Sequence, residues 1–132
     1  MSDIEIRSSN ENGFSATSTI GDFELSTHAQ GETAPSPNEV VVADYAQCFT
    51  YAFRATAARG DFDAPGSITT DAEADLDGED DLTAIRLTLH VETGYSEAEV
   101  KELVAGAEDI CHVHAALKPA LHADVTVDAG AR

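Results

Sequence analysis

The sequence predicts an α+β fold in which antiparallel sheets pack on two main helices. Alternating apolar and polar residues, typical of half-buried strands, fill residues 14–27, 68–76 and 85–91. Apolar residues at helical spacing, each run preceded by capping signals, fill residues 36–59 and 96–111. The strands come in runs before and between the helices, and this order is typical of α+β rather than α/β domains.

The N-terminal segment predicts a meander of antiparallel strands with one apolar face. Apolar and polar residues alternate in residues 3–7, then in residues 14–20 and again in residues 23–27. Turn-forming residues separate these runs at positions 10–13 and 21–22. A loop then leads to the first helix.

The first helix carries every start and stop signal. Ser36 is a natural N-cap, Pro37 suits the first helical position, Glu39 completes a capping box, and Gly60 favours a left-handed end. Two apolar stripes run along this helix, and a single sheet can cover only one of them. We therefore expect the second stripe to be buried against another copy of the chain. The stripes comprise Val41, Tyr45, Cys48, Ala52 and Ala55, and Val42, Ala46, Phe49 and Phe53.

The C-terminal half predicts a hairpin, a second helix and a closing strand. Residues 75–81 form an acidic turn that resembles a calcium loop, but it lacks flanking helices and the twelfth-position Glu, so a solvated turn is expected. Ser96 and Glu99 form a second capping box. Helical spacing runs from there to Cys111, and alternation returns at residues 121–127.

The length fits one domain, residues 1–132. The chain has 25 Asp plus Glu against 7 Lys plus Arg, a net charge of −18, which argues against a nucleic-acid partner. Together with scarce Lys, this acidity predicts a halophilic protein, because salt screens the repulsion between its charges. The chain shows no apolar run of about 18 residues and no signal-peptide pattern, so we expect a cytoplasmic protein with no membrane partner.

The two cysteines allow two interpretations. Cys48 lies in the middle of the first helix and Cys111 at the end of the second. One interpretation is a redox pair, in which one thiolate attacks a peroxide and the second thiol closes a disulfide. The other is a pair of inert core thiols, since free Cys is often buried. His112 and His114 add zinc-type donors beside Cys111, but no ligand quartet with zinc-like spacing exists, so we expect neither a metal nor another cofactor.

Two segments resemble motifs of the OsmC/Ohr family, which comprises osmotically inducible protein C and the organic hydroperoxide resistance proteins. Residues 35–48 read PSPNEVVVADYAQC and resemble the family pattern PSPxELLxAAxxxC. Residues 107–114 read AEDICHVH and resemble AxxxCPVH. The resemblance implies an OsmC-like fold and an intertwined homodimer with shared sites. It also implies oxidative stress defence by a cysteine-based peroxidase, with Cys48 as peroxidatic thiol and Cys111 as resolving thiol. Organic hydroperoxides would be the substrates, and a lipoyl-type dithiol the reductant.

The sequence departs from the peroxidase branches of this family at two positions. Those branches carry an Arg before the cysteine helix and a Glu ten residues before the first cysteine. His28 and Asn38 occupy these positions here, with Glu39 next to Asn38. The candidate catalytic residues are therefore Cys48, Cys111, Glu39 and His28. Glu39 is also explained by helix capping, and His28 by a place at a strand edge. Because a neutral imidazole stabilises a thiolate less than a guanidinium does, the alternative function is a non-catalytic module that binds a small ligand.

Overall fold

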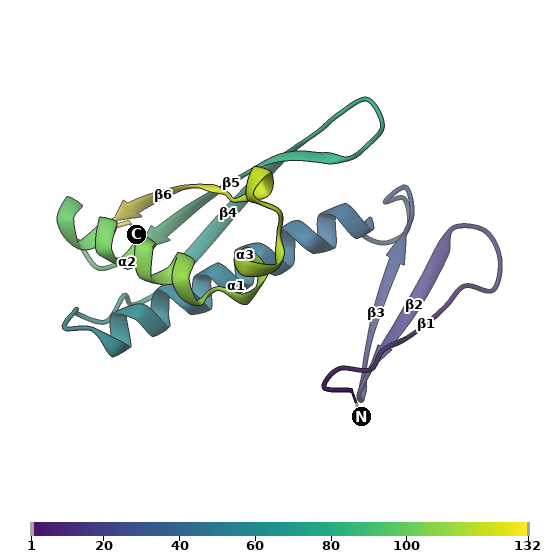
Figure 1. The fold of residues 1–132 in the computed structure, drawn as a ribbon, viewed down its shortest axis with the longest axis horizontal. Helices are drawn as coiled ribbons and strands as arrows, with labels where there is room; N and C mark the ends of the chain where they lie inside the picture. The colour runs from purple at the N-terminus through teal and green to yellow at the C-terminus, as the bar shows by residue number, and fades with distance from the viewer. Residues whose placement is uncertain (1, 132) are drawn as a thin grey trace. The chain divides into compact units, whose positions relative to one another are not determined.

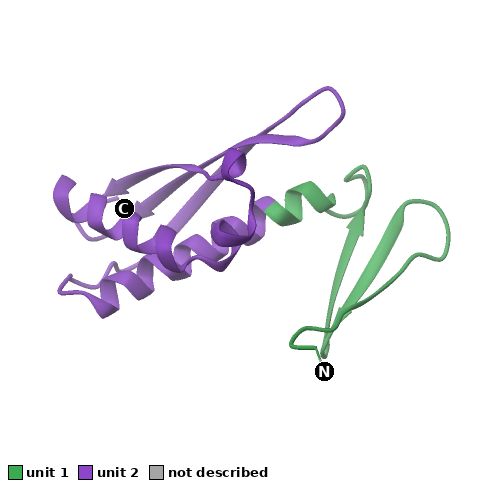
Figure 2. Ribbon diagram, viewed as in Figure 1, with its two compact units in different colours: residues 1–41 green, residues 42–132 purple. Residues whose placement is uncertain are grey.

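The computed structural model describes residues 2–131 and confirms the α+β class (Figure 1). The described chain forms two compact units, residues 1–41 and 42–132 (Figure 2). Each unit is built around its own sheet of three strands. The elements are β1 (Arg7–Ser9), β2 (Ser15–Ile20), β3 (Phe23–His28), α1 (Pro37–Arg59), β4 (Ile68–Leu76), β5 (Leu82–Val91), α2 (Glu97–Ile110), α3 (His112–Ala116), the 3₁₀ turn η1 (Pro119–Leu121) and β6 (Asp124–Ala129).

The N-terminal unit contains the predicted antiparallel meander, in the order β1-β2-β3. Its first strand is Arg7–Ser9, so the alternating segment 3–7 is a strand only at its last residue. The register explains the difference. Arg7 pairs with Thr19, and β2 ends one residue later, at Ile20. Residues before Ile6 therefore extend beyond the end of β2 and have no strand beside them.

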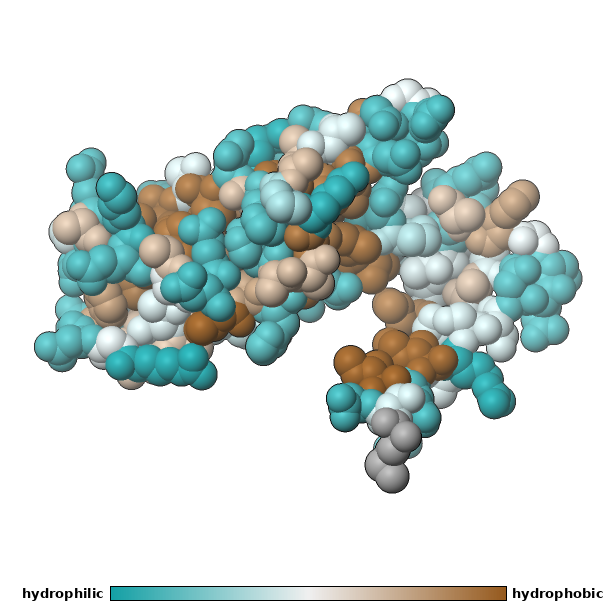
Figure 3. Space-filling view, viewed as in Figure 1, coloured by the Kyte–Doolittle hydropathy of each residue, from teal (hydrophilic) through white to brown (hydrophobic). Residues whose placement is uncertain are grey.

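One face of the meander is apolar and exposed. Ile20 lies opposite Phe23 in the antiparallel register, so both side chains point to the same face. Phe23 is 76% exposed and Phe14 is 66% exposed. On the opposite face the hydroxyls of Thr17 and Ser26 lie 3.1 Å apart. Apolar atoms reach the surface of this unit in Figure 3. The exposed apolar residues of the unit are Ile4, Ile6, Phe14, Ile20, Phe23 and Leu25.

The C-terminal unit has the strand order β4-β5-β6, with β5 in the centre. β4 runs antiparallel to β5, as predicted. β6 runs parallel to β5, whereas the sequence analysis expected antiparallel sheets. The connection explains the direction: α2 carries the chain back along the sheet before β6 begins, and a helical crossover joins parallel neighbours.

The core lies between one face of this sheet and the helices α1 and α2 (Figure 1). The inward residues of β5 are fully or almost fully buried: Ile85, Leu87, Leu89 and Val91. From α1, Tyr45, Phe49 and Phe53 are 0% exposed and Ala52 is 5% exposed. Residues from both predicted stripes are thus covered within one chain. α2 packs against α1 in addition to the sheet, but Val41, Val42, Ala46, Cys48 and Ala55 are only half-buried, so burial of the second stripe by another copy stays a prediction.

Helices α1 and α2 approach closely where Gly106 faces Thr56. A Cβ atom on Gly106 would lie 2.4 Å from Thr56 Cγ2 and 3.1 Å from Thr56 Oγ1. Thr56 Oγ1 donates to the carbonyl of Ala52 at 2.8 Å, which fixes the orientation of this side chain. The absence of a side chain at position 106 therefore sets the distance between the two helices.

Local signals at the helix ends are largely as predicted. The backbone N–H of Ser36 donates to Glu39 Oε1 at 2.9 Å, and the N–H of Glu39 donates to Ser36 Oγ at 3.2 Å. The second predicted capping box is also present, in α2. Gly60 follows the last residue of α1, but it does not adopt the left-handed conformation expected there. In the acidic turn, one Asp77 carboxylate oxygen accepts two backbone N–H groups, as in a solvated turn.

The outer face of the C-terminal sheet carries charged side chains that bridge its strands. The imidazole of His90 on β5 lies 3.0 Å from a carboxylate oxygen of Asp128 on β6 and 2.9 Å from one of Asp71 on β4. The two carboxylates raise the pKa of His90 above its usual value by accepting hydrogen bonds, Asp128 first. Arg86 on β5 forms a bidentate pair with Asp75 on β4.

No helix in the described part of the chain has both the length and the hydropathy to cross a membrane.

Candidate active site

Cys48 and Cys111 come from two elements that the C-terminal unit packs together. Cys48 lies in the middle of α1 and is half-buried. Cys111 is 1% exposed and lies between α2 and α3, where it caps both. Its backbone N–H donates to the carbonyl of Ala107 at 2.9 Å and closes α2. Its Sγ accepts the backbone N–H of His114 at 3.4 Å and begins α3. Because Cys111 ends α2 and begins α3, the two helix ends fix the position of its thiol.

The two thiols are free and interact with each other. The pKa of Cys111 is raised to about 11, mainly by burial and also by the neighbouring Cys48, while hydrogen bonds from the backbone of His114 and Val113 lower it. Cys111 is therefore protonated at neutral pH. The interaction with Cys48 raises the pKa of Cys111. The two cysteines therefore lie in different environments, which their spacing in the sequence could not show.

A hydrogen-bonded set of side chains holds the Cys111 segment against α1. Tyr45 lies one turn before Cys48, and its hydroxyl accepts the backbone N–H of Ala123 at 3.0 Å. The same hydroxyl forms a hydrogen bond of 2.6 Å with His114 Nδ1. Burial raises the pKa of Tyr45, and burial together with nearby His122 lowers the pKa of His114, so both rings are neutral at pH 7. The imidazole of His114 also stacks on that of His122, with centroids 3.8 Å apart.

The sequence analysis treated these residues differently. It counted Tyr45 as a core residue, and the structure shows a core residue whose hydroxyl also serves the site. It weighed His112 and His114 as metal donors and expected no metal. In the structure His114 is hydrogen-bonded to Tyr45, and within residues 2–131 no three His, Cys, Asp or Glu side chains are grouped so that they could hold a metal ion.

The two thiols open onto a cavity of about 470 Å³ on the C-terminal unit. Its walls are mostly apolar, and Arg59 and Asp109 are its charged members. The sequence analysis did not connect Arg59 with the site. The signal was the spacing: positions 48, 52, 55 and 59 lie on one side of a helix. The lining residues are Cys48, Tyr51, Ala52, Ala55, Arg59, Asp109, Ile110, Cys111, His112 and Ala115.

His28 and Glu39 belong to the N-terminal unit, and their described contacts are local. His28 is buried, its Nδ1 accepts the backbone N–H of Gln30 at 3.1 Å, and its Nε2 lies 3.9 Å from a carboxylate oxygen of Glu32. An accepting Nδ1 leaves the ring proton on Nε2. Glu39 is engaged in the capping box of α1. The structure thus gives both residues a local role, and their part in catalysis stays a prediction.

The family model for OsmC-like protein matches residues 29–126. The chain belongs to the OsmC-like family. Its matched region contains both cysteines and all elements from α1 to the start of β6. The resemblance of the two cysteine motifs is therefore confirmed at the level of the family.

Relatives of this OsmC-like protein extend over nearly all of its length. A protein of Haloferax volcanii is 49% identical over 127 residues, which cover 96% of each chain, and its source fits the expected adaptation to high salt. The crystal structure of an OsmC-like protein from Mycoplasma pneumoniae shares the fold, with a TM-score of 0.78, 18% identity and coverage of 97% of this chain and 96% of that one. The organic hydroperoxide resistance protein OhrB of Bacillus subtilis also shares it, with a TM-score of 0.68, 18% identity and coverage of 93% and 97%.

Proposed function

We propose that this protein reduces organic hydroperoxides with Cys48 as the peroxidatic thiol and Cys111 as the resolving thiol. The observation that carries the proposal is the hydrogen-bonded pair of free thiols at the wall of a cavity. Membership of a family whose relatives include organic hydroperoxide resistance proteins supports it.

The chemistry has two steps. The Cys48 thiolate attacks the terminal oxygen of the hydroperoxide, the O–O bond breaks, and the alkoxide takes a proton to leave as the alcohol. Cys48 becomes a sulfenic acid. The sulfur of Cys111 then attacks the sulfur of Cys48, and the hydroxyl leaves with the Cys111 proton as water. The product is a disulfide, which an external dithiol of the lipoyl type reduces.

The different environments of the thiols support this order. Cys48 is the half-buried member, and it lines the cavity from which a substrate would approach. Cys111 is buried and has a pKa of about 11, so it is a poor first nucleophile. As a protonated thiol beside Cys48, it carries the proton that the hydroxyl of the oxidised Cys48 needs in order to leave as water.

The test is a thiol count on reduced protein treated with cumene hydroperoxide in molar KCl. We expect both thiols to be lost as an intramolecular disulfide. Cys48→Ser should abolish the loss of Cys111, whereas Cys111→Ser should leave a sulfenic acid on Cys48 that a dimedone reagent traps. Thiols that survive excess peroxide would refute the proposal. His28→Gln and Glu39→Gln then test the two remaining candidates, and unchanged rates of Cys48 oxidation would remove them from the site.

A second candidate function is a non-catalytic module that binds a small ligand in the same cavity. The observation that favours it is the absence of an Arg between Arg7 and Arg54, before the cysteine helix. The rate of Cys48 alkylation by iodoacetamide as a function of pH separates the two functions. A pKa well below about 8.5 supports catalysis, whereas a pKa near or above that value supports binding.

The homodimer is part of the proposal, and the N-terminal unit offers a further apolar surface for it besides the half-buried residues of α1. Both stripes of α1 are largely covered within the chain, but the meander exposes Phe14, Ile20, Phe23 and Leu25. A second copy that covers this apolar surface explains why a soluble domain would expose it. Sedimentation at micromolar concentration in molar KCl should give about twice 13.9 kDa. Phe23→Ser should shift the protein toward the monomer, and a monomeric wild type would exclude this interface.

A further inference from the structure

Tyr45 and His114 connect the two cysteines by a second route, in addition to the interaction between the thiols themselves. Tyr45 comes one turn before Cys48 on α1, so the two residues lie on one side of that helix. The hydroxyl of Tyr45 forms a hydrogen bond of 2.6 Å with His114 Nδ1. The backbone N–H of His114 in turn donates to Cys111 Sγ at 3.4 Å. Because the sulfur of Cys111 interacts with Cys48, these contacts form a closed ring.

The tyrosine hydroxyl also holds the chain that follows Cys111. It accepts the backbone N–H of Ala123, the residue before β6, at 3.0 Å. The imidazole of His114 stacks on that of His122, with centroids 3.8 Å apart. Between them lies α3, which has five residues and little stability of its own. The segment that begins at Cys111 is therefore fixed to the helix of Cys48 through a single side chain.

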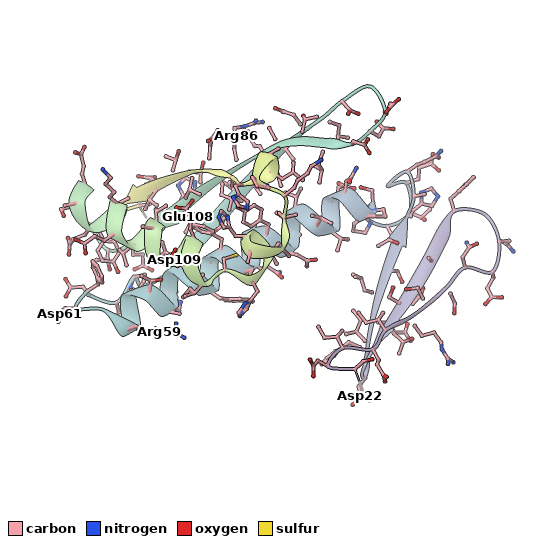
Figure 4. The ribbon with its side chains drawn as sticks, viewed as in Figure 1. Asp22, Arg59, Asp61, Arg86, Glu108 and Asp109 are labelled. Carbon is pink, nitrogen blue, oxygen red and sulfur yellow. The ribbon has the colours of Figure 1, made fainter. Side chains whose placement is uncertain are left out.

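The hydrogen bond between Tyr45 and His114 is shielded from water. Tyr45 is 0% exposed and His114 is half-buried. Burial is the main cause that raises the pKa of Tyr45 and lowers the pKa of His114. Glu108, near the C-terminal end of α2 in Figure 4, raises both pKa values through its charge. Because a shielded hydrogen bond is stronger than an exposed one, this bond can hold a neighbouring sulfur in position.

We propose that Tyr45 and His114 are positioning residues for the resolving step, because they hold the sulfur of Cys111 where it can attack the sulfur of Cys48. The inference rests on the proposed function, in which Cys111 closes the disulfide. A displacement of about 1 Å at a reacting atom can slow a step by about two orders of magnitude. Slow closure would leave the sulfenic acid of Cys48 open to a second hydroperoxide, which oxidises it to a sulfinic acid and leaves as the alcohol.

The experiment measures closure of the disulfide without peroxide. Reduced protein is mixed with dithiodipyridine, an uncharged disulfide, in molar KCl. The Cys48 thiolate attacks one of its sulfurs, the S–S bond breaks, and one thiopyridone leaves as a mixed disulfide forms on Cys48. The sulfur of Cys111 then attacks the Cys48 sulfur, and a second thiopyridone leaves with the Cys111 proton. The rate of this second release reports the position of Cys111, and Cys111→Ser should show the first release alone.

The variants of the pair should slow the second release and leave the first unchanged. For Tyr45→Phe we expect it to slow about tenfold, the factor that corresponds to one hydrogen bond of ordinary net strength. His114→Ala should have a similar effect, and His114→Asn, which keeps a polar amide near the place of Nδ1, should recover most of the rate. Because both side chains act through one bond, the double variant Tyr45→Phe/His114→Ala should lose much less than the product of the two single losses.

Tyr95→Phe is the matched control, because Tyr95 is also a buried tyrosine of the C-terminal unit. Its hydroxyl donates to the carbonyl of Asp63, in the loop after α1. This variant should lower Tm but keep the second release as fast as in the wild type, which separates the position of Cys111 from the stability of the fold. Under excess cumene hydroperoxide, mass spectrometry should find more sulfinic acid on Cys48 in Tyr45→Phe than in the wild type, and no increase in Tyr95→Phe.

Two results would overturn the positioning role. One is a second release as fast in Tyr45→Phe and His114→Ala as in the wild type, and the other is an equal slowing in Tyr95→Phe. The proposed function fails in a different way. A wild type that closes its disulfide with dithiodipyridine but keeps both thiols under excess peroxide would refute the peroxidase, whereas slow closure in Tyr45→Phe would still support the positioning role.

Discussion

Replacement of Gly106 by Ala tests how the contact between α1 and α2 keeps the two thiols together. The added Cβ would lie 2.4 Å from Thr56 Cγ2, well inside van der Waals contact. Thr56 cannot rotate away at no cost, because its hydroxyl is bonded to the carbonyl of Ala52. Overpacking of this kind costs about 1–3 kcal/mol. Ala gains up to about 1 kcal/mol over Gly in helix propensity. We therefore expect a net loss of about 1–2 kcal/mol in the free energy of unfolding.

Urea denaturation in molar KCl measures this change, and Tm should fall by about 3–6 °C. Thr56→Ser removes the methyl group that clashes but keeps the hydroxyl, so the double variant Thr56→Ser/Gly106→Ala should recover much of the loss. Gly78→Ala is the matched control, since a Cβ there has nothing within 4 Å.

The same substitution should also slow formation of the disulfide. α2 ends at Ile110, directly before Cys111, so a displacement of α2 moves the resolving thiol away from Cys48. A Gly106→Ala variant as stable as wild type, with no coupling to Thr56, would refute the claim that this contact sets the position of α2.

Three further predictions concern the stability of the fold. His90 has a raised pKa in the folded state because Asp128 and Asp71 accept its hydrogen bonds. The contribution of His90 to stability should be complete below about pH 6.5 and be lost as the pH rises through the raised pKa. In His90→Gln, Tm should therefore depend less on pH between about pH 6 and 9 than in the wild type. Replacement of the exposed His112 by Gln should leave the pH dependence of Tm unchanged. Tyr45→Phe leaves the N–H of Ala123 without an acceptor, so thermal unfolding should show a loss of about 1–3 kcal/mol. With a net charge of −18, Tm should fall as KCl is lowered from molar to millimolar, and equal Tm values would contradict the adaptation to high salt.

The sequence by itself determined the elements whose signals are local. The capping boxes at Ser36 and Ser96, the long helix and the alternation of residues 85–91 were all predicted, because each depends on neighbours a few positions away. The same is true of the two cysteine motifs, which were sufficient to indicate the family. The prediction of a strand before Arg7 was wrong for a non-local reason. A strand also needs a neighbouring strand to pair with, and β2 ends too early to pair with these residues.

The tertiary structure decided everything that depends on long-range packing. Periodicity showed that α1 is apolar on most sides but could not show that α2 covers it together with the sheet. It marked Cys48 and Cys111 without showing that their sulfurs interact or that burial keeps Cys111 protonated. It gave no link between Arg59 and the cysteines, which only the cavity brings together. The physical reason is the same in each case: side-chain periodicity fixes which face a residue occupies, whereas the partner on that face is set by segments far away in the chain.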